Sequence, residues 1–150
     1  MRILVDADSC PVLNIIEEIA EEYKVKLIIF SDIYHEIDSS YGKVIKVDRR
    51  AESVDMAISN KAKNGDIVVT QDYGLAALVL SKKCQVLNNK GHIFTEDNID
   101  YLLMKRHRHA KLRRAGKKHS NPKKRKKKDD KRFIKSLRKI LNNNNNNKNG

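Results

Sequence analysis

The sequence has few cysteines and no long hydrophobic run, and each shortage excludes a class of protein. Cys10 and Cys84 are its two cysteines among 150 residues, and they follow no zinc-binding or redox spacing. Two cysteines cannot build the framework of a disulfide-rich domain, so no disulfide partner is expected. No segment approaches the roughly 20 apolar residues of a membrane-spanning helix. Because the apolar run after Arg2 is also too short for a secretory signal, we expect a cytoplasmic protein with no membrane partner.

Charge is distributed unevenly along the chain. Residues 1–100 contain 12 Lys and Arg against 17 Asp and Glu, whereas residues 101–150 contain 20 against 2, which gives net charges of −5 and +18. An acidic body can hold a metal ion while a separate basic surface holds phosphates. The expected partner is therefore a nucleic acid, with RNA favoured. The basic stretch 105–128 contains no Phe, Trp or Tyr, so we expect it to contact phosphates rather than stack on bases.

Predicted strands and helices alternate along the first two thirds of the chain. Short apolar runs predict strands over residues 3–5, 26–31, 43–48, 66–70 and 84–87. Helical periodicity predicts helices over residues 12–23, 49–63 and 75–80, and from Thr95 into the basic segment. This alternation predicts a three-layer α/β/α fold with a mostly parallel central sheet.

Composition divides the chain into four parts. Residues 1–117 form the predicted α/β domain, and residues 118–128 form a basic linker that repels itself and is expected to be disordered when unbound. Residues 129–141 predict an amphipathic helix that packs on the domain. Residues 142–150 form an Asn-rich tail that we expect to be disordered.

Four acidic residues occupy positions that suit a metal site. Asp6 and Asp8 follow the first buried strand, Asp72 follows another, and Asp55 stands near the start of a helix. Chemistry in open α/β sheets lies at the carboxyl ends of the strands, so we expect these four acids to meet at one edge. Mg²⁺ and Mn²⁺ prefer hard oxygen ligands. The prediction is a Mg²⁺ or Mn²⁺ site on all four, with Asp6, Asp8 and Asp72 catalytic; the alternative is that some of them cap helices or bond loop amides.

Supporting roles are predicted for further polar residues. Ser9 and Thr70 are candidates to bond a metal-bound water or to orient a carboxylate, with simple capping as the alternative. An arginine at position 106 suits either a bidentate phosphate clamp or a pair with a core acid. The predicted phosphate contacts are Arg106, Arg108, Lys111, Arg113, Arg114, Lys117 and Lys118.

The segment Val5–Pro11 resembles the opening motif of the YaiI/YqxD family (UPF0178, DUF188), a group of uncharacterised bacterial proteins. The resemblance continues through Asp55, Gly65–Asp72, Leu75–Ala76, Val86–Leu87, Gly91, Arg106, Leu112–Arg113, Gly116, Asp130, Arg132, Phe133 and Leu137. That family is similar to PIN-like domains, which implies a metal-dependent nuclease fold with clustered Asp residues. The chain departs from the family at 120–128, where a linker containing Gly-Pro is usual and this sequence has Ser-Asn-Pro followed by six basic residues.

Three functions remain open on the sequence alone. The leading one is Mg²⁺- or Mn²⁺-dependent hydrolysis of RNA or DNA by the clustered carboxylates. The second is non-catalytic binding of nucleic acid, for example RNA or the ribosome. The third is a phosphatase similar to haloacid dehalogenases, because Asp6-x-Asp8 and Ser31 each follow a strand; Asp66 argues against it, since it stands before its strand rather than after.

Overall fold

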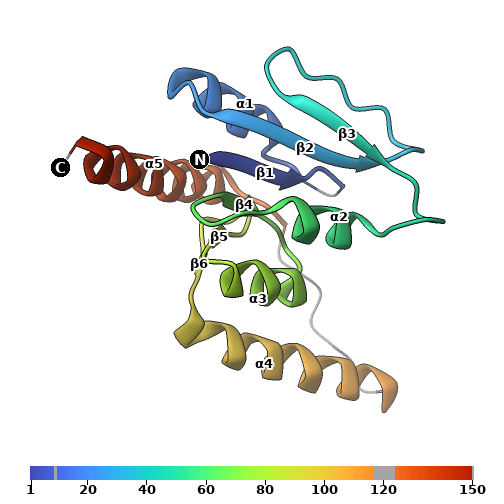
Figure 1. Cartoon of the computed structure of the whole chain (residues 1–150). Helices are drawn as coiled ribbons and strands as arrows, with labels where there is room; N and C mark the ends of the chain where they lie inside the picture. The colour runs from blue at the N-terminus through green and yellow to red at the C-terminus, as the bar shows by residue number, and fades with distance from the viewer. Residues whose placement is uncertain (9, 117–123, 150) are drawn as a thin grey trace.

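The fold has three layers: one central sheet and a layer of helices on each of its faces. The computed structural model describes residues 1–8, 10–116 and 124–149, and within them six strands lie in the order β3-β2-β1-β4-β5-β6 (Figure 1). Neighbouring strands are parallel except for the β5–β6 pair. The bounds are β1 (Arg2–Asp6), β2 (Lys26–Asp32), β3 (Lys43–Val47), β4 (Ile67–Val69), β5 (Gln85–Leu87) and β6 (Ile93–Phe94). The predicted mostly parallel sheet is confirmed.

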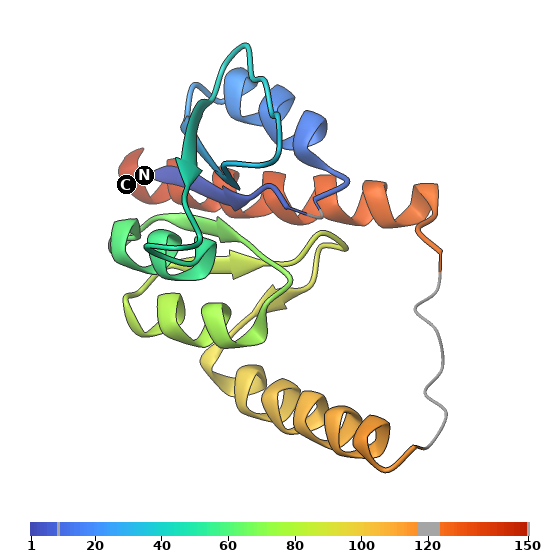
Figure 2. The same cartoon turned by 90° about the vertical axis from the view of Figure 1, so that its right-hand side faces the viewer.

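Helices cover both faces of the sheet, because alternate residues of each buried strand point to opposite sides. Ile3 and Val5 of β1 pack under α1 (Leu13–Glu22) and α5 (Lys127–Asn149). Leu4 packs under α2 (Val54–Lys61) and α3 (Tyr73–Ser81). The remaining helix, α4 (Glu96–Arg114), lies on the outer side of α3 (Figure 2). The predicted three-layer α/β/α class is therefore confirmed.

The strand order reverses between β1 and β4, and this reversal positions the site. The chain passes from β1 through α1 on one face, but from β4 through α3 on the other. The two connections diverge and leave a crevice at the carboxyl edge of the sheet, where ligands bind in open α/β folds. Asp6 ends β1 and Asp72 closely follows β4, so both acids flank this crevice.

Helix α5 packs against the sheet, although it begins at Lys127 and the last strand ends at Phe94. Phe133, Leu137 and Leu141 are fully buried in the core under it. The hydroxyl of Ser136 donates to the carbonyl of Gly91 at 2.7 Å. At Gly91, where φ is +84°, an added Cβ would lie 2.6 Å from a backbone oxygen of α5, so only glycine allows this close approach.

Several predicted boundaries were wrong for identifiable reasons. Helix α2 begins at Val54 rather than Arg49, because the Ser53 hydroxyl accepts the Met56 N–H and caps the helix there. The helix predicted from Thr95 was expected to continue through the basic residues to Lys118, but α4 ends at Arg114, two residues before Gly116 adopts a φ of +73°. The short antiparallel strand β6 was not predicted, since two residues are too few to show a period.

The Asn-rich segment also differs from the prediction. It was expected to form a disordered tail over residues 142–150, but α5 begins at Lys127 and continues as a helix to Asn149. Extending a formed helix costs much less than nucleating one, and the docked part of α5 supplies the nucleus. The Tyr23 hydroxyl also donates to the Asn142 side chain at 2.9 Å, which holds the first turn of this segment against α1.

Neither cysteine forms a disulfide: Cys84 is buried and Cys10 is half-buried. In the part of the chain that the structure describes, no helix combines the length and the apolar composition needed to cross a membrane.

Candidate metal centre

The candidate site is a cavity of about 440 Å³ at the carboxyl edge of the sheet. Asp6, Asp8, Asp55 and Asp72, which the sequence predicts as metal ligands, all line its wall. They come from three places in the fold: the end of β1 and the turn after it, the first turn of α2, and the N-cap of α3. The structure thus brings the four predicted acids to one cavity.

Local hydrogen bonds fix two of these carboxylates. One oxygen of Asp6 accepts the backbone N–H of Asp8 at 3.1 Å. Asp72 caps α3, since its side chain accepts the Leu75 N–H at 3.0 Å. The buried hydroxyl of Thr70 accepts the N–H of Asp72 at 3.0 Å, so Thr70 shapes the turn that presents Asp72. This bond matches the capping alternative for Thr70, whereas Ser9 lies outside the described residues.

Burial and the neighbouring acids shift the pKa values of three carboxyl groups in the cavity. Burial raises the pKa of Asp6 to about 6; the Asp8 N–H opposes this, while the charges of Asp8 and Asp55 add to it. Burial and the adjacent carboxyl of Asp72 raise the pKa of Asp55 to about 6 as well. Burial also acts on Asp72, but the Leu75 N–H, the Asp55 carboxyl and Arg106 outweigh it and lower the pKa of Asp72. At Asp6 and Asp55, therefore, the nearby arginines do not fully offset burial and the neighbouring carboxylates.

Two arginines stand over the cavity. Arg49 lies 3.2 Å from Asp8 and 3.2 Å from Asp32, and Arg106 of α4 lies 3.6 Å from Asp72. Their side chains are 59% and 56% exposed, so both guanidinium groups remain accessible from solvent. Arg106 was predicted either to clamp a phosphate or to pair with an acid, and the structure shows the ion pair. Arg49, which follows β3, was not predicted.

The other predicted phosphate contacts whose side chains the structure describes do not line the cavity. Arg108, Lys111 and Arg114 are exposed further along α4, which leads away from the acids. Position 113 belongs to the same helix. Lys117 and Lys118 lie outside the described residues.

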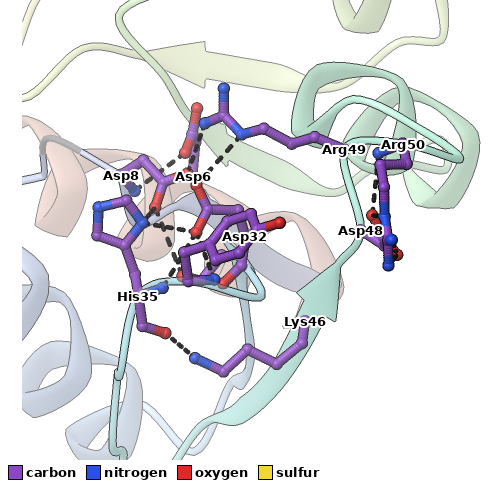
Figure 3. Close-up of polar contacts among 10 residues, drawn as sticks. Asp6, Asp8, Asp32, His35, Lys46, Asp48, Arg49 and Arg50 are labelled. Carbon is purple, nitrogen blue, oxygen red and sulfur yellow. Dashed lines mark hydrogen bonds and ion pairs between the residues drawn. The ribbon is translucent and has the colours of Figure 1, made fainter.

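A second group of possible ligands adjoins Asp8 and was missed from the sequence. Ligand atoms of Asp8, Asp32 and His35 lie within 4.8 Å of one another, and no other such group occurs in residues 1–8, 10–116 and 124–149. The imidazole of His35 lies 2.6 Å from Asp32 and 3.5 Å from Asp8 (Figure 3). Asp32 ends β2 beside β1, so the rule that selected Asp6 would also have found it. His35 stands in an irregular loop and gave no signal.

The donor sets differ in the metal that they suit. The four cavity acids offer only carboxylate oxygens, which Mg²⁺ and Mn²⁺ prefer. The group around His35 includes an imidazole, which suits Zn²⁺ or Fe²⁺ better than Mg²⁺. Asp32 also accepts the N–H groups of Tyr34 and His35 at 2.9 and 3.1 Å, so it organises its own turn. The oxygen donors of the cavity suit a hard divalent cation, although in the described residues no three of the four acids have ligand atoms within 4.8 Å of one another. A bound cation would stabilise the ionised form of Asp6.

The pH dependence of stability follows from Asp6. Its pKa is about 6 in the folded protein, against about 4 for an unperturbed Asp. Between these values the folded chain holds a proton that the unfolded chain has released, so this group's contribution to stability falls as pH rises from 4 to 6. Without metal, Asp6→Asn is expected to be more stable than wild type at pH 7, by about 1 kcal/mol once solvent screening is allowed for, and equal at pH 4. Urea unfolding in EDTA measures the difference.

Asp48 provides the matched control for this measurement. The guanidinium of Arg50 lowers the pKa of Asp48, so Asp48→Asn is expected to have the opposite sign and to lose stability at pH 7. Figure 3 shows Asp48 and Arg50 paired with each other, apart from the group around Asp8. An Asp6→Asn variant less stable than wild type at pH 7 would contradict the expectation.

Comparison with known proteins places the chain in a family. A family profile described as "Uncharacterized BCR, YaiI/YqxD family" matches residues 4–143. A UPF0178 protein of Clostridium novyi is 54% identical over 123 residues, which are 82% of this chain and 83% of the relative. A UPF0178 protein of Clostridium tetani is 52% identical over 123 residues, covering 82% and 84%. No solved structure matches the chain. On the family match and these identities, the chain belongs to the YaiI/YqxD (UPF0178) family.

Proposed function

We propose that this protein is a Mg²⁺- or Mn²⁺-dependent nuclease that hydrolyses phosphodiester bonds of RNA or DNA. One observation carries the proposal: four carboxylates from three places in the fold line one cavity at the strand-order reversal, with two accessible arginines above them. Carboxylates gather in this way to hold a divalent cation, and arginines recognise phosphate oxygens. The resemblance to PIN-like domains supports the same reading.

The roles of the chain's own residues follow from their placement. Asp6, Asp8, Asp55 and Asp72 would hold the cation, which when bound activates water and neutralises charge on the phosphate. Arg49 and Arg106 are free to move from their carboxylate partners to phosphate oxygens, because both lie more than half exposed at the cavity. Burial raises the pKa of the Cys10 thiol at the cavity wall, which disfavours the thiolate form that a cysteine nucleophile needs.

The substrate class is supported by α4. Arg106 reaches the cavity from this helix, and exposed cations at 108, 111 and 114 continue away from it. Such a row contacts phosphates without reading sequence, so binding should weaken steeply with added salt. A nucleic acid strand that enters the cavity would thus have a basic path beside it.

The phosphatase alternative is disfavoured by two contacts. Asp66 is buried and pairs with Arg2 at 2.6 Å, at the start of β1 and so at the opposite edge of the sheet from the cavity. The fully buried Ser31 hydroxyl has two acceptors for its single proton inside the fold, an oxygen of Asp8 at 3.4 Å and the Asp32 carbonyl at 3.3 Å. A phosphatase of that type would also form a covalent phosphate on Asp6, which phosphorylation trapping with acid quench would reveal.

Removal of metal tests the proposed function directly. Cleavage of labelled single-stranded RNA and DNA is expected with Mn²⁺ or Mg²⁺ and is expected to fall at least 100-fold in excess EDTA, because several kcal/mol of charge stabilisation are lost. Calorimetry of the metal-free chain with Mn²⁺ should show binding. Cleavage that persists in EDTA would contradict the metal requirement. Nucleic acid binding without cleavage and without Mn²⁺ binding would favour the non-catalytic alternative. In that case the exposed cations of α4 would account for the binding of nucleic acid.

A further inference from the structure

A second hollow of about 300 Å³ lies next to the candidate metal centre. Two pairs of consecutive residues connect them: Asp72 lines the metal cavity and Tyr73 lines the hollow, while Arg106 lines the cavity and Lys105 the hollow. We call this hollow the aromatic pocket. Its lining residues are Tyr73, Asn88, His92, Ile93, Phe94, Asn98, Tyr101, Leu102 and Lys105.

Flat rings form much of the pocket wall. Tyr73 packs edge-to-face on Phe94, with ring centroids 5.6 Å apart and an interplanar angle of 69°, which holds the Tyr73 ring in place. Tyr101 on α4 is 66% exposed, a large aromatic surface left to solvent. The imidazole of His92 is also exposed. The pocket therefore offers ring faces at which another flat group can stack.

Two asparagine side chains bond to backbone groups at the pocket and so favour a preformed shape. One oxygen of Asn88 accepts the N–H groups of Lys90 and His92, each at 2.9 Å. Asn98 accepts the Thr95 N–H at 2.9 Å and donates to the Ile93 carbonyl at 3.0 Å. These contacts hold the loop before β6 and the start of α4, both of which line the pocket. A preformed site loses little entropy when a ligand binds.

The positive charge of one lysine in the pocket wall favours an anionic ligand. Lys105 lines the pocket itself, and the exposed cations of α4 continue from it. A flat ring that is joined to phosphates satisfies both the aromatic wall and this charge. The volume is at the lower end for small-molecule sites, which suits one ring system rather than a protein segment.

We propose that the aromatic pocket binds one nucleobase of a single-stranded nucleic acid whose phosphate lies at the metal centre. The base stacks on Tyr101, and the Lys105 ammonium contacts a neighbouring phosphate. Stacking uses the π-face that every base has, so the pocket tolerates different bases and excludes paired strands. This inference rests on the proposed nuclease function, because that function is the reason for taking the anionic ligand to be a nucleic acid strand.

Binding to strands that lack single bases tests this pocket. The full-length chain is titrated in EDTA, so that no cleavage occurs, with labelled single-stranded oligonucleotides that are either complete or abasic at successive positions. Wild type is expected to bind the complete strand roughly 5- to 150-fold more tightly than the strand abasic at one position, as stacking on one aromatic side chain predicts. Tyr101→Ala is expected to remove this difference, whereas Tyr101→Phe keeps the ring and should retain it.

Leu112→Ala is the matched control. Leu112 is a 43% exposed apolar residue on the same helix, outside the pocket, so its loss should leave the difference intact. The proposal is overturned if Tyr101→Ala and wild type discriminate abasic strands equally, or if Tyr101→Ala instead dissociates a dimer in sedimentation velocity with discrimination unchanged. The cleavage assay distinguishes the two proposals. Discrimination against abasic strands without cleavage would contradict the nuclease function alone. Cleavage without Tyr101-dependent discrimination would contradict the base-binding pocket alone.

Discussion

Replacing Asp6 by Asn is expected to lower metal-dependent cleavage of single-stranded RNA or DNA about 10³-fold, with the fold unchanged. The side chain keeps its size and can still accept the Asp8 N–H, but it loses the charge that faces a cation. A bound metal contributes several kcal/mol of charge stabilisation, and each 1.36 kcal/mol is tenfold in rate. Single-turnover cleavage with saturating Mn²⁺ measures the effect. Calorimetry on the same samples should show weaker Mn²⁺ binding.

Asp48→Asn serves as the control, because Asp48 directly follows a strand of the same sheet but pairs with Arg50 and does not line the cavity. Its cleavage rate should stay within about twofold of wild type, since neither partner faces the site. Equal loss of activity in both variants would indicate a general effect of charge rather than a role at the metal centre. Full cleavage activity in the Asp6→Asn variant would show that the Asp6 carboxylate is not needed for cleavage.

Truncating Phe133 to Ala is expected to lower the free energy of unfolding by about 3–5 kcal/mol. Phe133 is fully buried under α5, so truncation loses the transfer free energy of the ring and leaves a cavity. Total stabilities of single domains are only about 5–15 kcal/mol, so this loss would remove a large fraction. Urea unfolding followed by circular dichroism measures the change at a pH where wild type unfolds in one step.

Lys135→Ala on the same helix is the control for this truncation. Lys135 is exposed, and alanine favours a helix at least as well, so the expected change is within about 0.5 kcal/mol. Near-equal stability of Phe133→Ala and wild type would mean that α5 is not part of the cooperative unit that unfolds.

Much of the site could be predicted because several of its acids stand at the carboxyl ends of strands that the sequence reveals. Asp6 and Asp72 follow apolar runs that form buried parallel strands, and the carboxyl ends of such strands share one edge. Asp32 satisfies the same rule beside β1 and could have been included. Arg49 and His35 could not be found in this way, since both reach the acids from irregular loops whose paths depend on tertiary packing.

The fold was predicted less well where local signals were weak. Strand β6 has two residues and pairs antiparallel, so neither its length nor its direction follows from periodicity. The Asn run has no apolar pattern, and its helical state comes from the docked helix before it. The aromatic pocket was hidden for a related reason: Tyr73 begins α3, whereas Phe94 and Tyr101 belong to β6 and α4, so composition alone could not bring the three rings together.

The position of α5 also constrains how the protein folds during synthesis. Residues 127–149 cover the face of β1, β4 and β5 that includes Ile3, Val69 and Leu87, so that face cannot close until this late segment leaves the ribosome. Contacts between such distant segments slow folding. In the interval, the nascent chain exposes apolar strands to other nascent chains and to chaperones. Chains halted before residue 127 are therefore expected to aggregate or to remain chaperone-bound.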